Sequence, residues 1–120
     1  MHGLSVDQDG QALVFSLRGE IDFLTAAPVT ETIQQAVARA RPTRVCVDLS
    51  DVTFLDSSGI GVLVAAMRAA KEISASFQVD HPDAYVFDQL DGAGLVEPFG
   101  LDGYQVDDPV DRPPAPGGGT

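Results

Sequence analysis

The segment TFLDSSGIGVL, residues 53–63, places small and polar residues between an apolar run and a helix-like pattern. These residues are Asp56, Ser57, Ser58, Gly59 and Gly61. At a junction between a strand and a helix, such residues can bind a phosphate, supply a serine nucleophile, or cap the helix by accepting a free backbone N–H. The three roles have different functional consequences, and the rest of the chain has to discriminate among them.

An enzymatic or nucleotide-binding role for this segment would need further residues that the chain does not supply. The nucleophile motif G-x-S-x-G needs a glycine at position 55, where this chain has Leu55. His2 and His81 are each solitary, so we expect both to be solvated rather than catalytic. Phosphate binding in the manner of a P-loop is disfavoured, because G-x-x-x-x-G-K-[ST] does not occur and Lys71 lies far down the helix. With no His/Cys cluster either, we expect no catalytic residue, metal or cofactor.

Helix capping by Asp56 or Ser57 is the simplest interpretation on spacing alone, and a cap contributes about 1 kcal/mol. Capping does not explain Gly59 and Gly61, because a glycine inside a helix costs about 1 kcal/mol relative to alanine. They require a close approach, either by another part of the chain or by a docking partner. Phosphorylation of a serine is the remaining functional interpretation, since a helix N-terminus tolerates a phosphate whose charge then acts on whatever docks there.

Composition narrows the class of partner. The chain has 7 Lys plus Arg against 18 Asp plus Glu, a net charge of −11, which disfavours nucleic acids and anionic membranes and attracts a basic protein.

An apolar content of 44% with only 7% aromatic residues predicts a core of Val, Leu, Ile and Ala. The single cysteine, Cys46, reads as a small core residue. Because no signal peptide or membrane-spanning run is evident, we expect a cytoplasmic protein.

Alternating apolar residues on both sides of Asp9-Gly10 predict a hairpin of strands 4–8 and 12–19. A helix should follow, capped by Thr25 and stopped by Pro42, with Pro28 in its first turn. Its apolar face is predicted to hold Val29, Ile33, Ala36, Val37 and Ala40. The run RVCVDLS, residues 44–50, is apolar at nearly every position and predicts a central strand covered on both faces. The segment DLSDVTFLDSS would then be the loop that leads to the next helix.

The second helix should start at Ser57. Its apolar stripe is predicted to hold Ile60, Leu63, Val64, Met67 and Ala70. A short strand at 76–80 precedes a third helix, which Asp83 caps and Gly92 stops; Tyr85, Val86 and Leu90 form its apolar side. The run LVEPFGL predicts an edge strand. The sequence thus indicates one α/β domain over 1–106, with an opening hairpin and parallel crossovers, and a disordered Pro/Gly-rich acidic tail over 107–120.

Two motifs taken together resemble the STAS domain of bacterial anti-sigma factor antagonists, also called anti-anti-sigma factors. They are GEID within RGEIDFLTA and DSSGIGVL within FLDSSGIGVL, the latter following VDLSDV. The resemblance covers roughly residues 4–100. It implies a STAS-type α/β domain, with a mixed sheet of four to five strands opened by an antiparallel hairpin and about three helices.

The resemblance implies a binding protein and not an enzyme. Unphosphorylated members bind a GHKL-type serine-kinase anti-sigma factor and thereby free the sigma factor. It places the phosphorylated serine on Ser57 and a docking acid on Asp22. The other contact residues that it implies are Asp56, Ser58, Gly59, Ile60 and Gly61, the glycines allowing the partner to approach closely. ATP and magnesium would belong to the kinase, so the chain itself would carry no cofactor and act as a monomer or weak dimer.

Two alternatives stay open at this point. The chain could be a STAS scaffold subunit of a larger signalling or lipid-transport complex, or a nucleotide-binding protein that uses residues 56–61. Family members commonly carry basic residues around the third helix, where this chain has DAYVFDQLDGAG. Many also end in a further helix, which the Pro/Gly-rich tail replaces here.

Overall fold

The hairpin that opens the chain is formed by β1 (Gly3–Asp9) and β2 (Ala12–Ile21), which pair antiparallel as predicted. Gly10 adopts a φ of 64°, a left-handed conformation that glycine takes without steric penalty. Asp9 pairs with Ala12, so the two-residue turn is made by Gly10 and the residue after it. The computed structural model describes residues 3–105.

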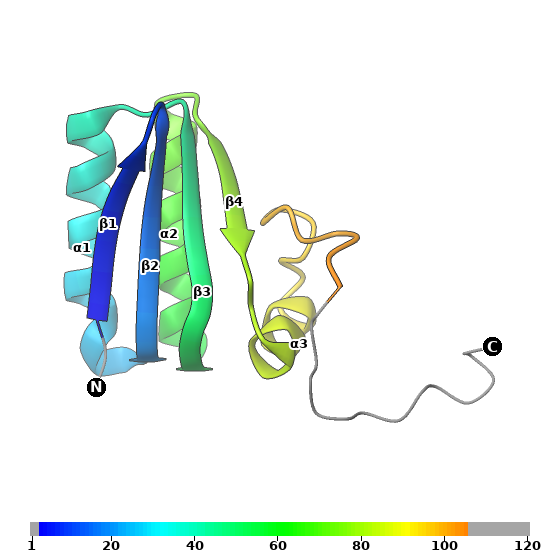
Figure 1. Cartoon of the computed structure of the whole chain (residues 1–120). Coiled ribbons are helices and arrows are strands. Elements are labelled where there is room, and N and C mark those ends of the chain that lie inside the picture. Colours follow the sequence, from blue (N-terminus) through cyan, green and yellow to red (C-terminus); the bar gives the residue numbers. More distant parts are fainter. Residues whose placement is uncertain (1–2, 106–120) are drawn as a thin grey trace, which may run out of the picture.

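Two parallel crossovers extend this hairpin into a four-stranded sheet of order β1-β2-β3-β4 (Figure 1). Helix α1 (Phe23–Ala40) connects β2 to β3 (Arg44–Leu55), and α2 (Ser57–Glu72) connects β3 to β4 (Ser76–Asp80). Both crossovers advance in the same direction across the sheet, which places both helices on one face. Strand β3 is interior to the sheet, and the consecutive residues Val45, Cys46 and Val47 are all buried, so the prediction of a central strand covered on both faces is confirmed for this part of the strand.

Strand β3 is longer than predicted. Residues 51–55 belong to the strand and not to a loop, so the strand leads directly into α2 at Asp56. The pairing of β2 with β3 shifts register twice, and each shift leaves an extra residue in β3. The residues of this part that face the core, Leu49, Val52 and Leu55, consequently recur at every third position. Because a regular strand alternates buried and exposed residues, this spacing prevented the prediction of residues 51–55 as strand.

The core lies between the sheet and the two helices. Helix α1 buries Val29, Ile33 and Val37, as predicted, whereas Ala40 is exposed. In α2, Leu63 and Ala70 of the predicted stripe are buried, and the other buried residues are Gly59, Val62 and Ala66. The predicted positions 60, 64 and 67 are only half-buried. Small residues on this face let α2 lie close to the sheet.

Helix α1 begins one turn before the position predicted. Its N-cap is Asp22, whose carboxylate accepts hydrogen bonds from the backbone N–H groups of Leu24 (3.0 Å) and Thr25 (3.3 Å). Thr25 was predicted as the cap but is the reciprocal partner, because its hydroxyl accepts the Asp22 N–H at 2.9 Å. Pro28 consequently lies inside the helix and not in its first turn.

The end of α2 is closed by a left-handed residue. Ser74 has a φ of 60°, and the Ser74 and Ala75 N–H groups donate to the carbonyls of Lys71 (3.0 Å) and Ala70 (2.9 Å). This pair of hydrogen bonds is the Schellman arrangement, in which glycine is the preferred left-handed residue.

Replacing Ser74 with glycine should therefore raise the free energy of unfolding by about 0.5–1 kcal/mol, because glycine has no Cβ to strain this conformation. Urea denaturation measures the change. Ser74→Ala is the matched control, since alanine keeps the strain and should give no gain. An equal gain in both variants would contradict the role assigned to the left-handed backbone.

Helix α3 (Ala84–Gly92) is capped by Asp83 as predicted, with the Val86 N–H donating to its carboxylate at 2.8 Å. Val86 and Leu90 are buried, but Tyr85, predicted on the same apolar side, is 47% exposed.

Residues 95–101 form turns rather than the predicted edge strand, although the Val79 N–H donates to the Phe99 carbonyl at the edge of β4. The predicted tail, 107–120, lies outside the described residues. Within 3–105, no helix is long and apolar enough to cross a membrane.

Candidate functional site

The strand-to-helix junction at residues 55–57 resolves which side chain caps α2. Asp56 has an extended backbone, with φ −101° and ψ −169°, and its carboxylate accepts the Gly59 N–H at 3.0 Å. Asp56 is thus the N-cap, and Ser57 is the first residue of the helix. Of the two predicted caps, Asp56 is confirmed and Ser57 is not the cap.

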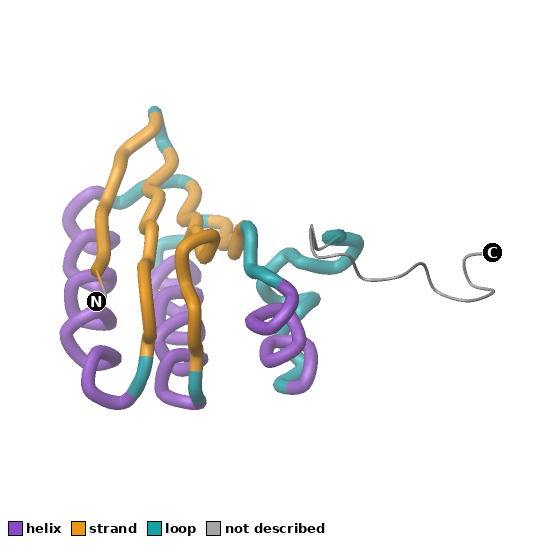
Figure 2. The backbone as a smooth tube through the Cα atoms, turned by 60° about the horizontal axis from the view of Figure 1, so that its bottom comes forward, coloured by secondary structure: helices purple, strands orange, loops and turns teal. Residues whose placement is uncertain are grey.

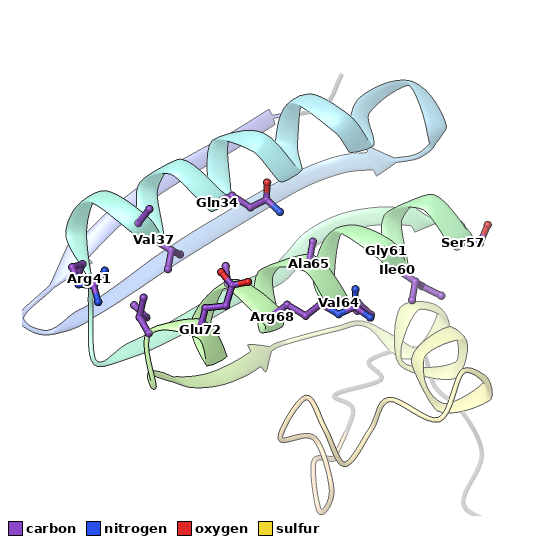
Figure 3. Close-up of a pocket in the computed structure, with 13 residues that line it drawn as sticks. Gln34, Val37, Arg41, Ser57, Ile60, Gly61, Val64, Ala65, Arg68 and Glu72 are labelled. Carbon is purple, nitrogen blue, oxygen red and sulfur yellow. The ribbon is translucent and has the colours of Figure 1, made fainter.

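The two serines keep their hydroxyls unused. Ser57 is exposed and Ser58 half-buried, and within residues 3–105 neither hydroxyl forms a hydrogen bond. Ser57 lies at the end of α2 with its oxygen directed outward (Figure 3). Its Oγ is therefore accessible to a second protein, next to the free N–H groups of the first helical turn.

Gly59 has an internal function. It is buried, and a Cβ at this position would collide with the carbonyl oxygen of Ile21 and come within 2.7 Å of the Leu55 side chain. The close approach that Gly59 permits is therefore made by the end of β2, and a contact of Gly59 with a partner stays a prediction. Gly61 differs, since it is exposed and a Cβ there would meet nothing within 4 Å.

The contact between Gly59 and Ile21 brings the two sequence motifs together. Asp22 directly follows Ile21, so the start of α1 lies beside the first turn of α2, and both helices begin at the same edge of the sheet (Figure 2). Asp22 is half-buried and caps α1 through Oδ1. Its role as a docking acid stays a prediction, and a test must preserve the cap.

A groove between α1 and α2 leads away from this edge. Ser57, Ile60 and Gly61 line the end nearest the junction (Figure 3). The two cations of the groove, Arg41 and Arg68, come from farther along the helices. The first turn of α2 itself carries no lysine or arginine, so it lacks the cation that a P-loop brings to a nucleotide.

Sequence reasoning missed Phe23 and Leu24, which are 77% and 79% exposed at the start of α1. The signal was present: the first turn of a helix favours acids, and this one contains two large apolar residues and no acid. Phe23 lines a second groove together with Ser58 and Gly61 of α2.

Cys46 takes no part in the site. It is 6% exposed on β3, and burial, followed by the nearby Asp80 carboxylate, raises the pKa of its thiol. A thiol held in the protonated state is a poor nucleophile. The prediction that Cys46 is a small core residue is confirmed.

Comparison with known proteins connects this arrangement to a family. The family model described as "Mlab, STAS domain" matches residues 4–102. The chain belongs to the STAS domain family. This confirms the resemblance carried by the GEID and DSSGIGVL motifs, and the four-stranded mixed sheet with three helices is the STAS fold.

Two mycobacterial proteins similar to this STAS domain are named as anti-sigma factor antagonists. The anti-sigma-F factor antagonist RsfB of Mycobacterium tuberculosis is 48% identical over 59 residues, which are 49% of this chain and 47% of RsfB, so the chain spans about half the length of that relative. An anti-sigma factor antagonist from Mycobacterium paratuberculosis has a similar structure, with a TM-score of 0.73 and 27% identity over 82% of this chain and 83% of that one.

The same fold occurs in SpoIIAA, a Bacillus anti-sigma factor antagonist whose structure is known in two forms. The unphosphorylated form has a TM-score of 0.71 at 21% identity, covering 81% of this chain and 84% of SpoIIAA. The phosphorylated form has a TM-score of 0.65 at 20% identity, covering 81% and 87%. At this level of identity the likeness establishes the fold alone.

Proposed function

We propose that this STAS domain is an anti-sigma factor antagonist whose partner is a GHKL-type serine-kinase anti-sigma factor. The unphosphorylated chain binds the anti-sigma factor, which then releases its sigma factor, and phosphate on Ser57 ends that binding. The names of the mycobacterial relatives support the class of function. The existence of unphosphorylated and phosphorylated forms of SpoIIAA supports regulation by phosphorylation.

The observation that carries the proposal is the separation of roles between Asp56 and Ser57. Asp56 caps α2, so the neighbouring hydroxyl is not needed to hold the helix. Ser57 is exposed at the edge where both helices begin, which is where a visiting protein can reach it.

The chemistry is phosphoryl transfer with this chain as the acceptor. Ser57 Oγ attacks the γ-phosphorus of ATP held by the kinase, the bond from that phosphorus to the β-bridging oxygen breaks, and ADP leaves. A base of the kinase accepts the hydroxyl proton. The nucleotide and its magnesium are held by the kinase, so this chain acts as substrate and regulator and supplies no catalytic residue.

Phosphosite mapping tests the proposal. The chain is incubated with ATP and, in turn, with each serine-kinase anti-sigma factor of the source organism, and the product is mapped by mass spectrometry. One cognate kinase should add a single phosphate, located on Ser57, and Ser57→Ala should abolish it while still binding the kinase.

Ser58→Ala is the matched control, because Ser58 is the adjacent hydroxyl but is half-buried. This variant should be phosphorylated as the wild type is. Phosphate on Ser58, or no phosphate with any of the kinases, would count against the assignment.

A further inference from the structure

Exposed apolar side chains gather around Ser57. Within residues 3–105, five large hydrophobic residues are exposed: Val6, Phe23, Leu24, Phe54 and Tyr85. All except Val6 come from the end of β3 or the starts of α1 and α3, the edge that holds the junction (Figure 1). Clustered exposed apolar residues mark interaction sites, whereas scattered ones do not.

Phe23 and Leu24 form the first cluster, which we name the first anchor. They directly follow the cap Asp22, and the buried face of α1 begins only at Thr25. The fold therefore gains no core packing from either side chain, and the N-terminal dipole would favour acids at both positions. Their apolar character requires a reason outside the folded chain.

Phe54 and Tyr85 form the second anchor. Their rings stack with centroids 6.4 Å apart and an interplanar angle of 23°, which joins the end of β3 to α3. They are 37% and 47% exposed, so the stack buries only part of each ring. The Tyr85 hydroxyl also accepts a hydrogen bond from Gln89 at 3.2 Å, which holds the ring in place.

Ser57 is connected to both anchors. Phe54 precedes it by three residues along the chain, and the contact of Gly59 with Ile21 holds the first anchor beside the same helical turn. Each anchor also has a carboxylate neighbour. Glu20 is the cross-strand neighbour of Phe54, Asp22 precedes Phe23, and Asp83 lies close to Tyr85 in sequence.

We propose that the two anchors belong to one docking surface, which a single partner covers together with Ser57. The partner is the kinase of the proposed function, on which this inference rests. It presents two apolar pockets and, at their rims, basic side chains that complement the carboxylates of a chain with net charge −11. The anchors set the position of Ser57 against the nucleotide of the kinase, and they exclude water around the serine.

Affinity measurements on exposed-residue variants test the two-anchor surface. The cognate kinase is titrated with wild-type chain, with the double variant Phe23→Ala/Leu24→Ala, and with Tyr85→Ala. Each variant should weaken binding by about 10-fold or more, and the triple variant by at least about 100-fold. Val6→Ala is the matched control, because Val6 is 41% exposed but lies on β1, and it should bind as wild type. Thermal unfolding checks that every variant folds.

The outcomes are distinguishable. Binding by the anchor variants at wild-type affinity, with Ser57 still phosphorylated, overturns the two-anchor surface and leaves the proposed function intact. A loss confined to one anchor overturns the inference that one partner covers both. Failure of the wild-type chain to bind any serine-kinase anti-sigma factor overturns the function and the surface together. Sedimentation that shows a wild-type dimer dissolved by the anchor variants assigns the surface to a second copy of the chain and overturns the proposal.

Discussion

Phosphorylation of Ser57 should lower the affinity for the anti-sigma factor by roughly 100-fold while changing the free energy of unfolding by less than about 1 kcal/mol. In the proposed complex the phosphate would lie opposite negatively charged groups of the partner. A unit charge about 5 Å from another costs about 3 kcal/mol at an effective dielectric constant near 20, which exceeds the roughly 2.7 kcal/mol that a 100-fold loss requires. Within the free chain, the N-terminus of α2 attracts the phosphate and the Asp56 carboxylate repels it, so the two effects offset each other.

Calorimetric titration and urea denaturation of the phosphorylated and unphosphorylated chains measure the two quantities. Ser57→Glu should reproduce part of the affinity loss, since it carries one negative charge, and Ser57→Gln is the uncharged control of similar size. Equal losses for Glu and Gln would assign the effect to bulk and contradict the electrostatic explanation.

Replacing Gly59 with alanine should destabilise the domain by about 1–3 kcal/mol. The added methyl group meets the Ile21 carbonyl and the Leu55 side chain, and a backbone oxygen in a paired strand cannot move aside cheaply. Alanine gains up to about 1 kcal/mol of helix propensity over glycine, which is smaller than the penalty for overpacking. Urea denaturation should show a lower midpoint with an unchanged slope.

Gly61→Ala is the matched control for this substitution. Gly61 lies two residues farther along the same helix, is exposed, and has open space at the Cβ position. The same chemical change should here raise the free energy of unfolding by about 0.5–1 kcal/mol. If both variants lost stability equally, the penalty would belong to the helix and not to the contact with β2.

The sequence predicted those secondary-structure elements whose formation depends on neighbouring residues. The Asp9-Gly10 dipeptide located the hairpin, the apolar periodicity located both long helices, and Asp83 was identified as the cap of α3. The pairing of GEID with DSSGIGVL identified the family and directed attention to Asp22 and Ser57. Each of these signals is contained within a few neighbouring residues or within one motif pair.

The sequence did not allow us to predict features that depend on contacts between residues distant in the chain. The two register shifts in β3 arise from pairing with β2, so the strand was cut short and its last residues were read as a loop. The internal contact of Gly59 could not be predicted, because its neighbour in space, Ile21, is far from it in the chain. The exposure of Phe23 and Leu24 was missed because the helix was predicted to start at the cap Thr25, which left both residues outside it.

The assignment of the cap to Asp56, and not to Ser57, has a consequence for the lifetime of the protein. A phosphate on Ser57 would leave this cap in place, so it should change the opening of the unbound chain to cellular proteases only slightly. The two unbound forms should therefore be degraded at similar rates. Under the proposed function, phosphorylation would then set the active fraction of the protein with little effect on its amount.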